Sequence, residues 1–137
     1  MTSDSHARSA AIVQDLAAAT APLAIVQLRV LGGATARVPA TATAFAHRTS
    51  RLMVNVTAVY HQPEEAQVHR AWADRLAATL QGDGQARAYA NFLADEGQSR
   101  VRQAYPAPTW QRLAAVKARY DPTNLFHLNQ NIPPAKR

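Results

Sequence analysis

The sequence contains no cysteine, which excludes disulfides, thiolate metal ligands and a cysteine nucleophile within this chain. No apolar run approaches the ~18 residues that cross a bilayer, and the first residues lack the basic start and apolar stretch of a signal peptide. Basic residues outnumber acidic ones by 15 to 9, but they are scattered singly and form no run. We therefore expect a cytoplasmic protein that binds neither nucleic acid nor membrane.

Aromatic residues are also scarce, at 7% of the 137 residues, although 47% are hydrophobic because alanine is abundant. A chain of this length has room for one domain with its own core. We expect that core to consist of small side chains around a few large anchors: Phe45, Trp72, Phe92 and Trp110.

The histidines and glycines show no known site spacing. His61 and His69 lie eight residues apart, and no pair has His-x₃-His spacing, so no metal site is expected. The "LGGATAR" stretch lacks the Lys-Ser/Thr of a phosphate-binding loop. His47 is expected to be a packed structural residue.

Helical periodicity appears in three segments. Residues 4–20 carry Ile12, Val13 and Leu16 at helical spacing. A second helix begins at Pro63, which suits a first turn, and buries a stripe of residues spaced by four: Val68, Trp72, Leu76 and Leu80. A third helix is expected over residues 109–119, with Thr109 as its N-cap.

Strand-like alternation appears in "LAIVQLRV" and "RLMVNVTAVYH", and a short strand is expected at residues 43–47. In the first segment Gln27 and Arg29 share one face, and in the second Asn55 and Thr57 share one face. We therefore predict an α+β fold, an antiparallel sheet covered by helices on one face, with an extended C-terminal tail. Residues 1–108 would form one unit and residues 109–137 a C-terminal helix and tail.

The tail "KARYDPTNLFHLNQNIPP" has an unusual composition for a chain end. Pro122 stops the preceding helix, and the turn that follows is expected to send Leu125 and Phe126 into an apolar surface. Alternation in an extended segment would then put Asn129 and Asn131 on the same side, where their amides suit a polar ligand. The alternative is a cap that holds the tail in place without binding anything.

Three stretches carry a resemblance to a known family. The tail "VKARYDPTNLFHLNQNIPP", the segment "VLGGATARVPATATAFAHR" and the loop "AYANFLADEG" are similar to the C-terminal portion of bacterial FAD-linked oxidases of the berberine bridge enzyme type. Residues 9–134 follow the order of that family. The resemblance implies that residues 1–108 form a partial substrate-domain unit and that the helix and tail of residues 109–137 pack on the FAD domain. The resemblance implies FAD as cofactor, although the Arg-x-Gly-Gly-His attachment motif and the attachment cysteine of the family's flavin domain are absent from this chain.

The resemblance also nominates site residues. It implies that Gln27 and Arg29 face the substrate, although a solvated strand face is the alternative, and that Tyr89 and Asn91 lie near the flavin. Many relatives carry, at the position of Phe92, a tyrosine proposed as the catalytic base, and phenylalanine cannot exchange a proton. Either Tyr89 takes that role, or another group does, or the reaction needs no base. Asn91, Asn129 and Asn131 would contact the cofactor.

Two functions remain open from the sequence. The chain is either the C-terminal part of a flavin oxidoreductase acting on an alcohol, sugar or amine carbon, with FAD held by a separate domain, or a non-catalytic remnant that serves as a small binding or dimerisation module. In the second case the surface left by a missing domain would expose apolar residues, with Leu125, Phe126 and Ile132 as candidates.

Overall fold

The computed structural model describes residues 2–82 and 87–136, with side chains from Ser5 onward. Its contacts divide the chain into two compact units. The first unit combines the chain up to Leu31 with a segment that begins at Arg51, and the second combines Gly32–Ser50 with the C-terminal part of the chain. Each unit is described by itself.

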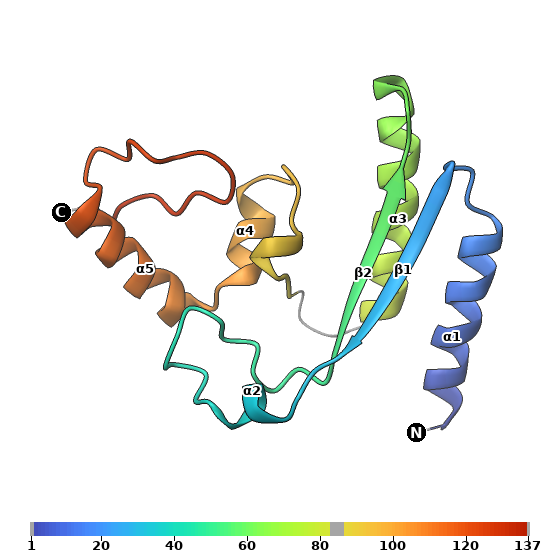
Figure 1. The fold of residues 1–137 in the computed structure, drawn as a ribbon, viewed down its shortest axis with the longest axis horizontal. Helices are drawn as coiled ribbons and strands as arrows, with labels where there is room; N and C mark the ends of the chain where they lie inside the picture. Colours follow the sequence, from blue (N-terminus) through green and yellow to red (C-terminus); the bar gives the residue numbers. More distant parts are fainter. Residues whose placement is uncertain (1, 83–86, 137) are drawn as a thin grey trace. The chain divides into compact units, whose positions relative to one another are not determined.

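The first unit is a two-stranded antiparallel ribbon flanked by helices (Figure 1). Its elements are α1 (Thr2–Ala17), β1 (Leu23–Val30), β2 (Leu52–Val59), the 3₁₀ turn η1 (Pro63–Glu65) and α3 (Ala66–Gln81). The register runs from Leu23 opposite Val59 to Val30 opposite Leu52. The predicted α+β class, with an antiparallel sheet and helices on one face, is confirmed.

The alternation of the strands places their small apolar residues against the helices. Ala24 and Val26 of β1 lie opposite Ala58 and Val56 of β2, and these four pack against the core of the unit. That core consists of three buried residues of α3, Trp72, Leu76 and Leu80, with partly buried residues of α1. The odd-numbered positions of both strands, which include Gln27 and Asn55, point to the other face.

The helical segment that leads into α3 begins at Pro63, as predicted, and is stabilised by hydrogen bonds between neighbouring residues. Glu65 reaches back with its carboxylate to accept hydrogen bonds from the backbone N–H groups of His61 and Gln62, at 3.2 and 3.1 Å. These bonds complete a capping box, which satisfies donors that have no partner inside the helix.

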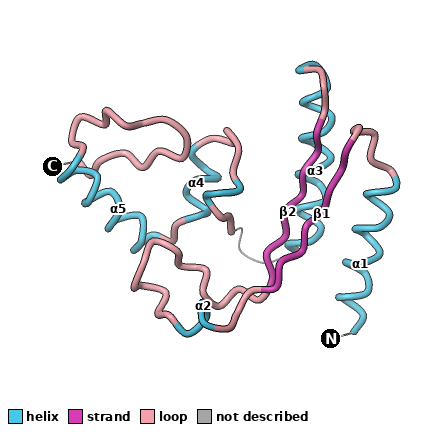
Figure 2. The backbone as a smooth tube through the Cα atoms, in the orientation of Figure 1, coloured by secondary structure: helices cyan, strands magenta, loops and turns pink. Residues whose placement is uncertain are grey.

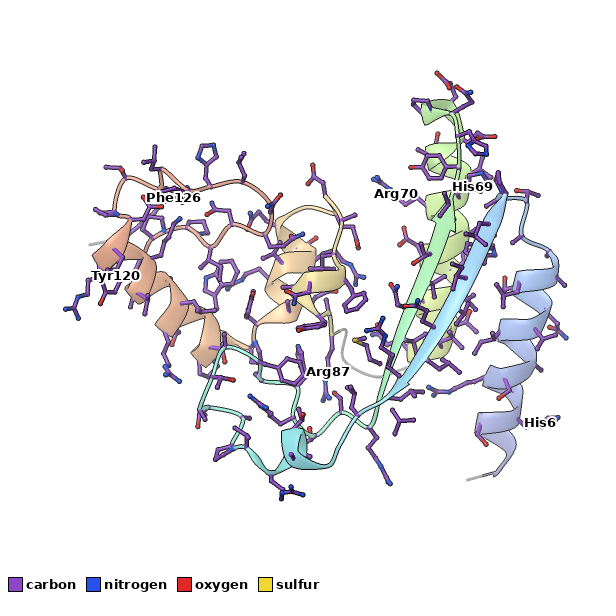
Figure 3. All side chains as sticks on the ribbon, in the orientation of Figure 1. His6, His69, Arg70, Arg87, Tyr120 and Phe126 are labelled. Atoms are coloured by element: carbon purple, nitrogen blue, oxygen red, sulfur yellow. The ribbon has the colours of Figure 1, made fainter. Side chains whose placement is uncertain are left out.

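The buried stripe of α3 differs from the prediction at its first position. Val68 is 62% exposed, and His69 is buried in its place and stacks on Tyr60 with 5.4 Å between ring centroids (Figure 3). Residues eleven apart lie almost on one line of a helix, so His69, not Val68, aligns with Leu80. Val13 of α1 is likewise exposed, whereas Ile12 and Leu16 pack on the core.

The second unit is dominated by short helices and loops (Figure 2). Its elements are α2 (Ala34–Arg37), η2 (Ala90–Phe92), α4 (Gln98–Ala104) and α5 (Ala107–Tyr120). The helix α4 was not predicted, because its seven residues are too few to show a clear period. After α5 the tail runs toward α4 and returns to α5, where the Ala135 N–H donates to the Ala114 carbonyl at 3.0 Å (Figure 1).

The strand predicted at residues 43–47 is wrong, since this segment is a loop. Arg48 supplies the loop with hydrogen-bond partners that a sheet would otherwise provide. Its guanidinium donates to the carbonyls of Phe45 and Thr35, at 3.0 and 3.2 Å, and to the Thr43 hydroxyl at 2.6 Å. The alternation of apolar and polar residues in a short segment does not show that a neighbouring side chain such as Arg48 will supply these hydrogen bonds.

Two expectations for α5 are also corrected. Thr109 is not the N-cap: the helix begins two residues earlier, after Pro106, with Pro108 in its first turn. The buried residue of the helix is Ala114, whereas Val116 is 54% exposed. The core of this unit is therefore built from small residues: Val101, Ala104 and Ala114.

Of the four aromatic anchors expected from the sequence, only Trp72 is buried, with 7% of its surface exposed. Trp110 is half-buried beneath the Arg102 guanidinium, 4.2 Å from its ring centroid, and Phe45 is half-buried. Phe92 is 36% exposed and is not a core residue. The two compact units do not follow the division at residue 108; the expectation that residues 109–137 pack on a flavin domain stays a prediction.

Replacing Leu76 with alanine is expected to destabilise the first unit by about 2–5 kcal/mol, because the side chain is fully buried and its loss leaves a cavity. Urea unfolding followed by Trp72 fluorescence, in a Trp110→Phe background, measures this unit. The control Val68→Ala, on the exposed side of the same helix, should change the free energy of unfolding by about 0.5 kcal/mol or less. Equal effects of the two changes would contradict the assigned core.

Candidate functional site

Tyr89 lies at the start of a tight turn in the second unit. It precedes η2, and the Phe92 N–H donates to the Tyr89 carbonyl at 2.8 Å to close the turn. The Ala88 N–H donates to Gln103 in α4 at 3.3 Å, which ties the turn to that helix. The backbone around Tyr89 is therefore fixed on both sides.

The Tyr89 side chain is 36% exposed and contacts three neighbours. The centroid of the Phe45 ring lies 5.5 Å from that of Tyr89 in a T-shaped arrangement, and the Phe92 centroid lies 5.6 Å away with the rings tilted by 36°. The Asn91 amide nitrogen donates to the Tyr89 hydroxyl at 3.0 Å. The structure thus brings Tyr89 and Asn91, both nominated from the sequence, into direct contact.

Three charged or titratable groups lie near Tyr89 in sequence or in space. Arg87 donates to the Ser50 hydroxyl at 3.2 Å (Figure 3). Burial raises the pKa of Tyr105, and the nearby Tyr89 raises that pKa further. His47 is half-buried with its Nε2 3.1 Å from the Ala104 carbonyl, as expected of a packed structural residue.

The tail is held by Asp121, not by the apolar contacts predicted from the sequence. Leu125 and Phe126 are 71% and 78% exposed, so the expectation that they enter an apolar surface is wrong. Instead, the Asp121 carboxylate accepts hydrogen bonds from the backbone N–H groups of Leu125 and Phe126, at 2.7 and 3.0 Å. Lys117 forms an ion pair with the same carboxylate at 2.5 Å and also donates to the Phe126 carbonyl.

These contacts lower the pKa of Asp121 below its usual range. The hydrogen bond from Lys117 is the main cause, and the two backbone N–H groups add to it, whereas desolvation acts in the opposite direction. An aspartate side chain after a helix end therefore fixes the direction in which the tail leaves α5.

The tail amides are tied to the Tyr89 turn through Gln130. Its amide nitrogen donates to the carbonyls of Leu93 and Ala94, at 2.9 and 3.2 Å, directly after η2. Gln98 at the start of α4 donates to the Asn131 carbonyl at 3.4 Å. The segment with the Asn-Gln-Asn sequence and the turn with Tyr89 thus share one unit and one set of hydrogen bonds.

Asn129 and Asn131 do not share a side of an extended segment, contrary to the prediction. Asn129 has a left-handed backbone, φ 57°, and its carbonyl accepts from the Asn131 N–H at 2.9 Å, so the chain bends there. Asn129 is exposed, whereas the Oδ1 atom of Asn131 is buried and has no hydrogen-bond partner among the described residues.

Gln27 and Arg29 lie in the first unit, exposed on the odd-numbered face of β1. Gln27 stands opposite Asn55 of β2, whose amide nitrogen lies 3.5 Å from its Oε1 atom. The Arg29 guanidinium donates to the same oxygen at 3.3 Å, and Asn55 donates to the Thr57 hydroxyl at 3.1 Å. Asn55 and Thr57 were not nominated from the sequence, although their alternation already placed them on one face.

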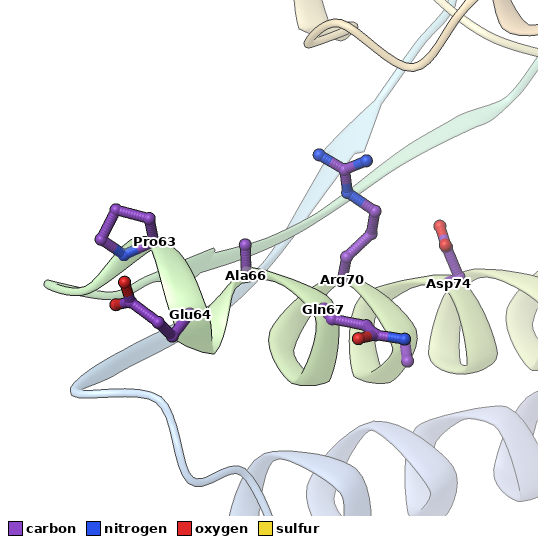
Figure 4. Close-up of a pocket in the computed structure, with 7 residues that line it drawn as sticks. Pro63, Glu64, Ala66, Gln67, Arg70 and Asp74 are labelled. Atoms are coloured by element: carbon purple, nitrogen blue, oxygen red, sulfur yellow. The ribbon is translucent and has the colours of Figure 1, made fainter.

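A shallow hollow of about 530 Å³ lies along the exposed side of η1 and α3 (Figure 4). Its charged lining residues are Glu64, Arg70 and Asp74. None of the residues nominated from the sequence lines this hollow, and it is open to solvent along its length.

Within residues 2–82 and 87–136, no group of three or more histidine, aspartate or glutamate side chains is placed to hold a metal ion. None of the helices found in those ranges has both the length and the apolar character needed to span a bilayer.

Comparison with solved structures defines the class of fold. The chain superposes on wild-type Physcomitrella patens BBE-like 1 with a TM-score of 0.77 at 23% identity, covering 96% of this chain and 28% of that one. The two units described above therefore have the architecture of part of a berberine-bridge-enzyme-like protein.

The sequence comparisons find the same similarity. Residues 88–133 match the family model "Berberine and berberine like". An uncharacterized FAD-linked oxidoreductase of Bacillus subtilis, YvdP, is 31% identical over 77% of this chain, and Arabidopsis thaliana berberine bridge enzyme-like 6 is 31% identical over 80% of it. Residues 88–133 thus match the berberine-like family, and most of the chain is similar to part of these two relatives, spanning 23% of the length of each.

Replacing Asp121 with asparagine is expected to release the tail, because the ion pair with Lys117 and the charged acceptor for two N–H groups are lost. Hydrogen exchange at the Leu125 and Phe126 amides should become at least several-fold faster at neutral pH. Asp95→Asn, an exposed carboxylate of the same unit, is the matched control and should leave both rates unchanged.

The same contact predicts a pH dependence. Because the folded pKa of Asp121 is lower than its unfolded value, its stabilising effect is fully present above about pH 4 and is lost as the pH falls through the lowered pKa. The amide chemical shifts of Leu125 and Phe126 should titrate with that midpoint in the wild type and not in Asp121→Asn. Titration at or above the ordinary aspartate pKa would contradict the assignment.

Proposed function

We propose that this chain forms part of the catalytic surface of an FAD-dependent oxidase that dehydrogenates an alcohol, sugar or amine carbon. The observation that supports it most is the Tyr89 turn: a tyrosine that is 36% exposed, with its hydroxyl hydrogen-bonded by Asn91, at the beginning of the segment that matches the berberine-like family. A proton-exchanging group with a fixed ring and an accessible oxygen is what such a reaction requires of the protein.

The residues of the second unit fit a flavin as neighbour. Asn129 is exposed and offers both amide donors and a carbonyl acceptor, which match the alternating donors and acceptors on the edge of a flavin ring. The buried Oδ1 of Asn131, which has no hydrogen-bond partner among the described residues, is a further acceptor in the same tail. Bound FAD would supply the two-electron acceptor for the substrate carbon–hydrogen bond and pass the electrons to O₂.

Tyr89 would handle the proton of the substrate. In its phenolate form its oxygen takes the proton from the substrate hydroxyl or amine and becomes a phenol, which later returns the proton to solvent. Phe92, three residues further on, has no group that exchanges protons, so Tyr89 is the proton-exchanging residue of this turn.

The polar face of the ribbon would bind the substrate. Gln27 and Arg29 are exposed there and are joined to each other through the Gln27 Oε1 atom. An amide and a guanidinium side by side suit a substrate with several hydroxyl oxygens or a carboxylate.

The cofactor would be held by an FAD-binding domain beyond these 137 residues, on the same or a separate polypeptide. The relatives are about four times longer than the stretch matched here. The second unit also exposes a set of apolar side chains that an added domain would cover, which we call the tail patch (Figure 3): Tyr120, Leu125, Phe126 and Leu128, each 71–79% exposed. A second copy of the chain is the alternative occupant of this patch.

Replacing Tyr89 with phenylalanine, in the enzyme completed by an FAD-binding domain, is expected to lower turnover by about 10²-fold or more with its flavin content unchanged. Tyr60→Phe, in the first unit, is the matched control. Turnover at the wild-type level in Tyr89→Phe would remove Tyr89 from the proposed reaction.

A further inference from the structure

The Tyr89 ring is held by a loop that Arg48 organises. The Phe45 and Tyr89 rings meet in a T-shaped arrangement at 77°, and the Arg48 guanidinium lies over the Phe45 ring at 5.1 Å while its Nε donates to the Phe45 carbonyl. Phe92 packs on Tyr89 from within the turn. With the ring fixed from two directions, the hydroxyl oxygen has one position, and what varies is the direction of its proton and lone pairs.

The direction of those lone pairs is set by Asn91. Its amide nitrogen lies two residues along the same tight turn and donates to the Tyr89 oxygen at 3.0 Å. As the acceptor of this bond, the oxygen keeps its second lone pair and its own proton for a group outside the turn. The bond strengthens as the oxygen gains negative charge, because hydrogen bonds to charged acceptors are stronger than those between neutral groups.

We propose that Asn91 is a positioning residue for Tyr89, acting through this hydrogen bond rather than through a contact with the cofactor. This inference rests on the proposed role of Tyr89 and replaces the expectation that Asn91 contacts the flavin. The amide N–H holds the oxygen toward the substrate and stabilises the negative charge that the oxygen carries before it takes the proton.

Asn91→Asp tests the proposal in the enzyme completed by an FAD-binding domain. Aspartate has the same shape as asparagine but replaces the N–H donor with a negative oxygen. We expect kcat to fall about tenfold or more, with KM changed less than threefold and flavin content unchanged. Asn91→Gln, which keeps the amide on a longer side chain, should recover part of the lost kcat.

A double-mutant cycle separates positioning from other roles. In a Tyr89→Phe background the hydroxyl is absent, so Asn91→Asp should lower kcat by less than twofold. An equal loss in both backgrounds, or loss of flavin in Asn91→Asp, would overturn the proposal. If Tyr89→Phe alone keeps full turnover, the proposed function itself fails and this inference fails with it.

The contact can also be tested in the 137-residue chain without a cofactor. The side-chain amide protons of Asn91 should move toward the chemical shifts of a free amide when Tyr89 is replaced with phenylalanine. The side-chain amide of Asn55, which donates to Thr57 in the other unit, is the control and should not move. An Asn91 amide signal unaffected by Tyr89→Phe would show that the bond does not form.

Discussion

The carboxylate of Asp121 holds the C-terminal tail through an ion pair with Lys117 and hydrogen bonds to two backbone N–H groups. Asp121 follows α5 directly, so these bonds determine the direction of every residue after the helix. The tail can then place Gln130 against the carbonyls that follow the Tyr89 turn. A polar interaction has this influence because the surrounding core is made of small residues and the large apolar side chains of the tail remain exposed.

The second unit is consequently organised by side-chain hydrogen bonds more than by apolar packing. Arg48 holds the loop that contains Phe45, Asp121 holds the tail, and Gln130 joins the tail to the turn. The residues nominated for chemistry are located by these contacts. The side chains of the tail patch, in contrast, are 71–79% exposed, which is what we expect of a surface that another domain covers.

Features with a regular period could be predicted from the sequence. The alternation of β1 and β2 identified the polar face of Gln27 and Arg29, and the period of α3 identified Trp72, Leu76 and Leu80. The prediction placed Val68 in the buried stripe, whereas the structure buries His69. A strict four-residue spacing fails there because an α-helix has 3.6 residues per turn. The tail and the loop at residues 43–47 could not be predicted, because hydrogen bonds made by single side chains, Asp121 and Arg48, hold them and leave no periodic signal.

Periodicity gives no information about Tyr89 and Asn91. The resemblance to the family nominated these two residues for an FAD-dependent reaction. The structure adds the direct bond between the two side chains and the attachment of the tail amides to the same turn. It also separates the nominated residues into two groups, with Gln27 and Arg29 in one compact unit and the other four in the second.

The most direct test of the central claim, that these residues need an added domain to hold FAD, is the visible absorption spectrum of the purified chain after incubation with FAD and desalting. Size-exclusion elution of the same sample would report its oligomeric state. We predict a colourless protein that gains a flavin band only when an FAD-binding domain is supplied. A stoichiometric flavin band in the 137-residue chain alone, as a monomer or an oligomer, would contradict the claim.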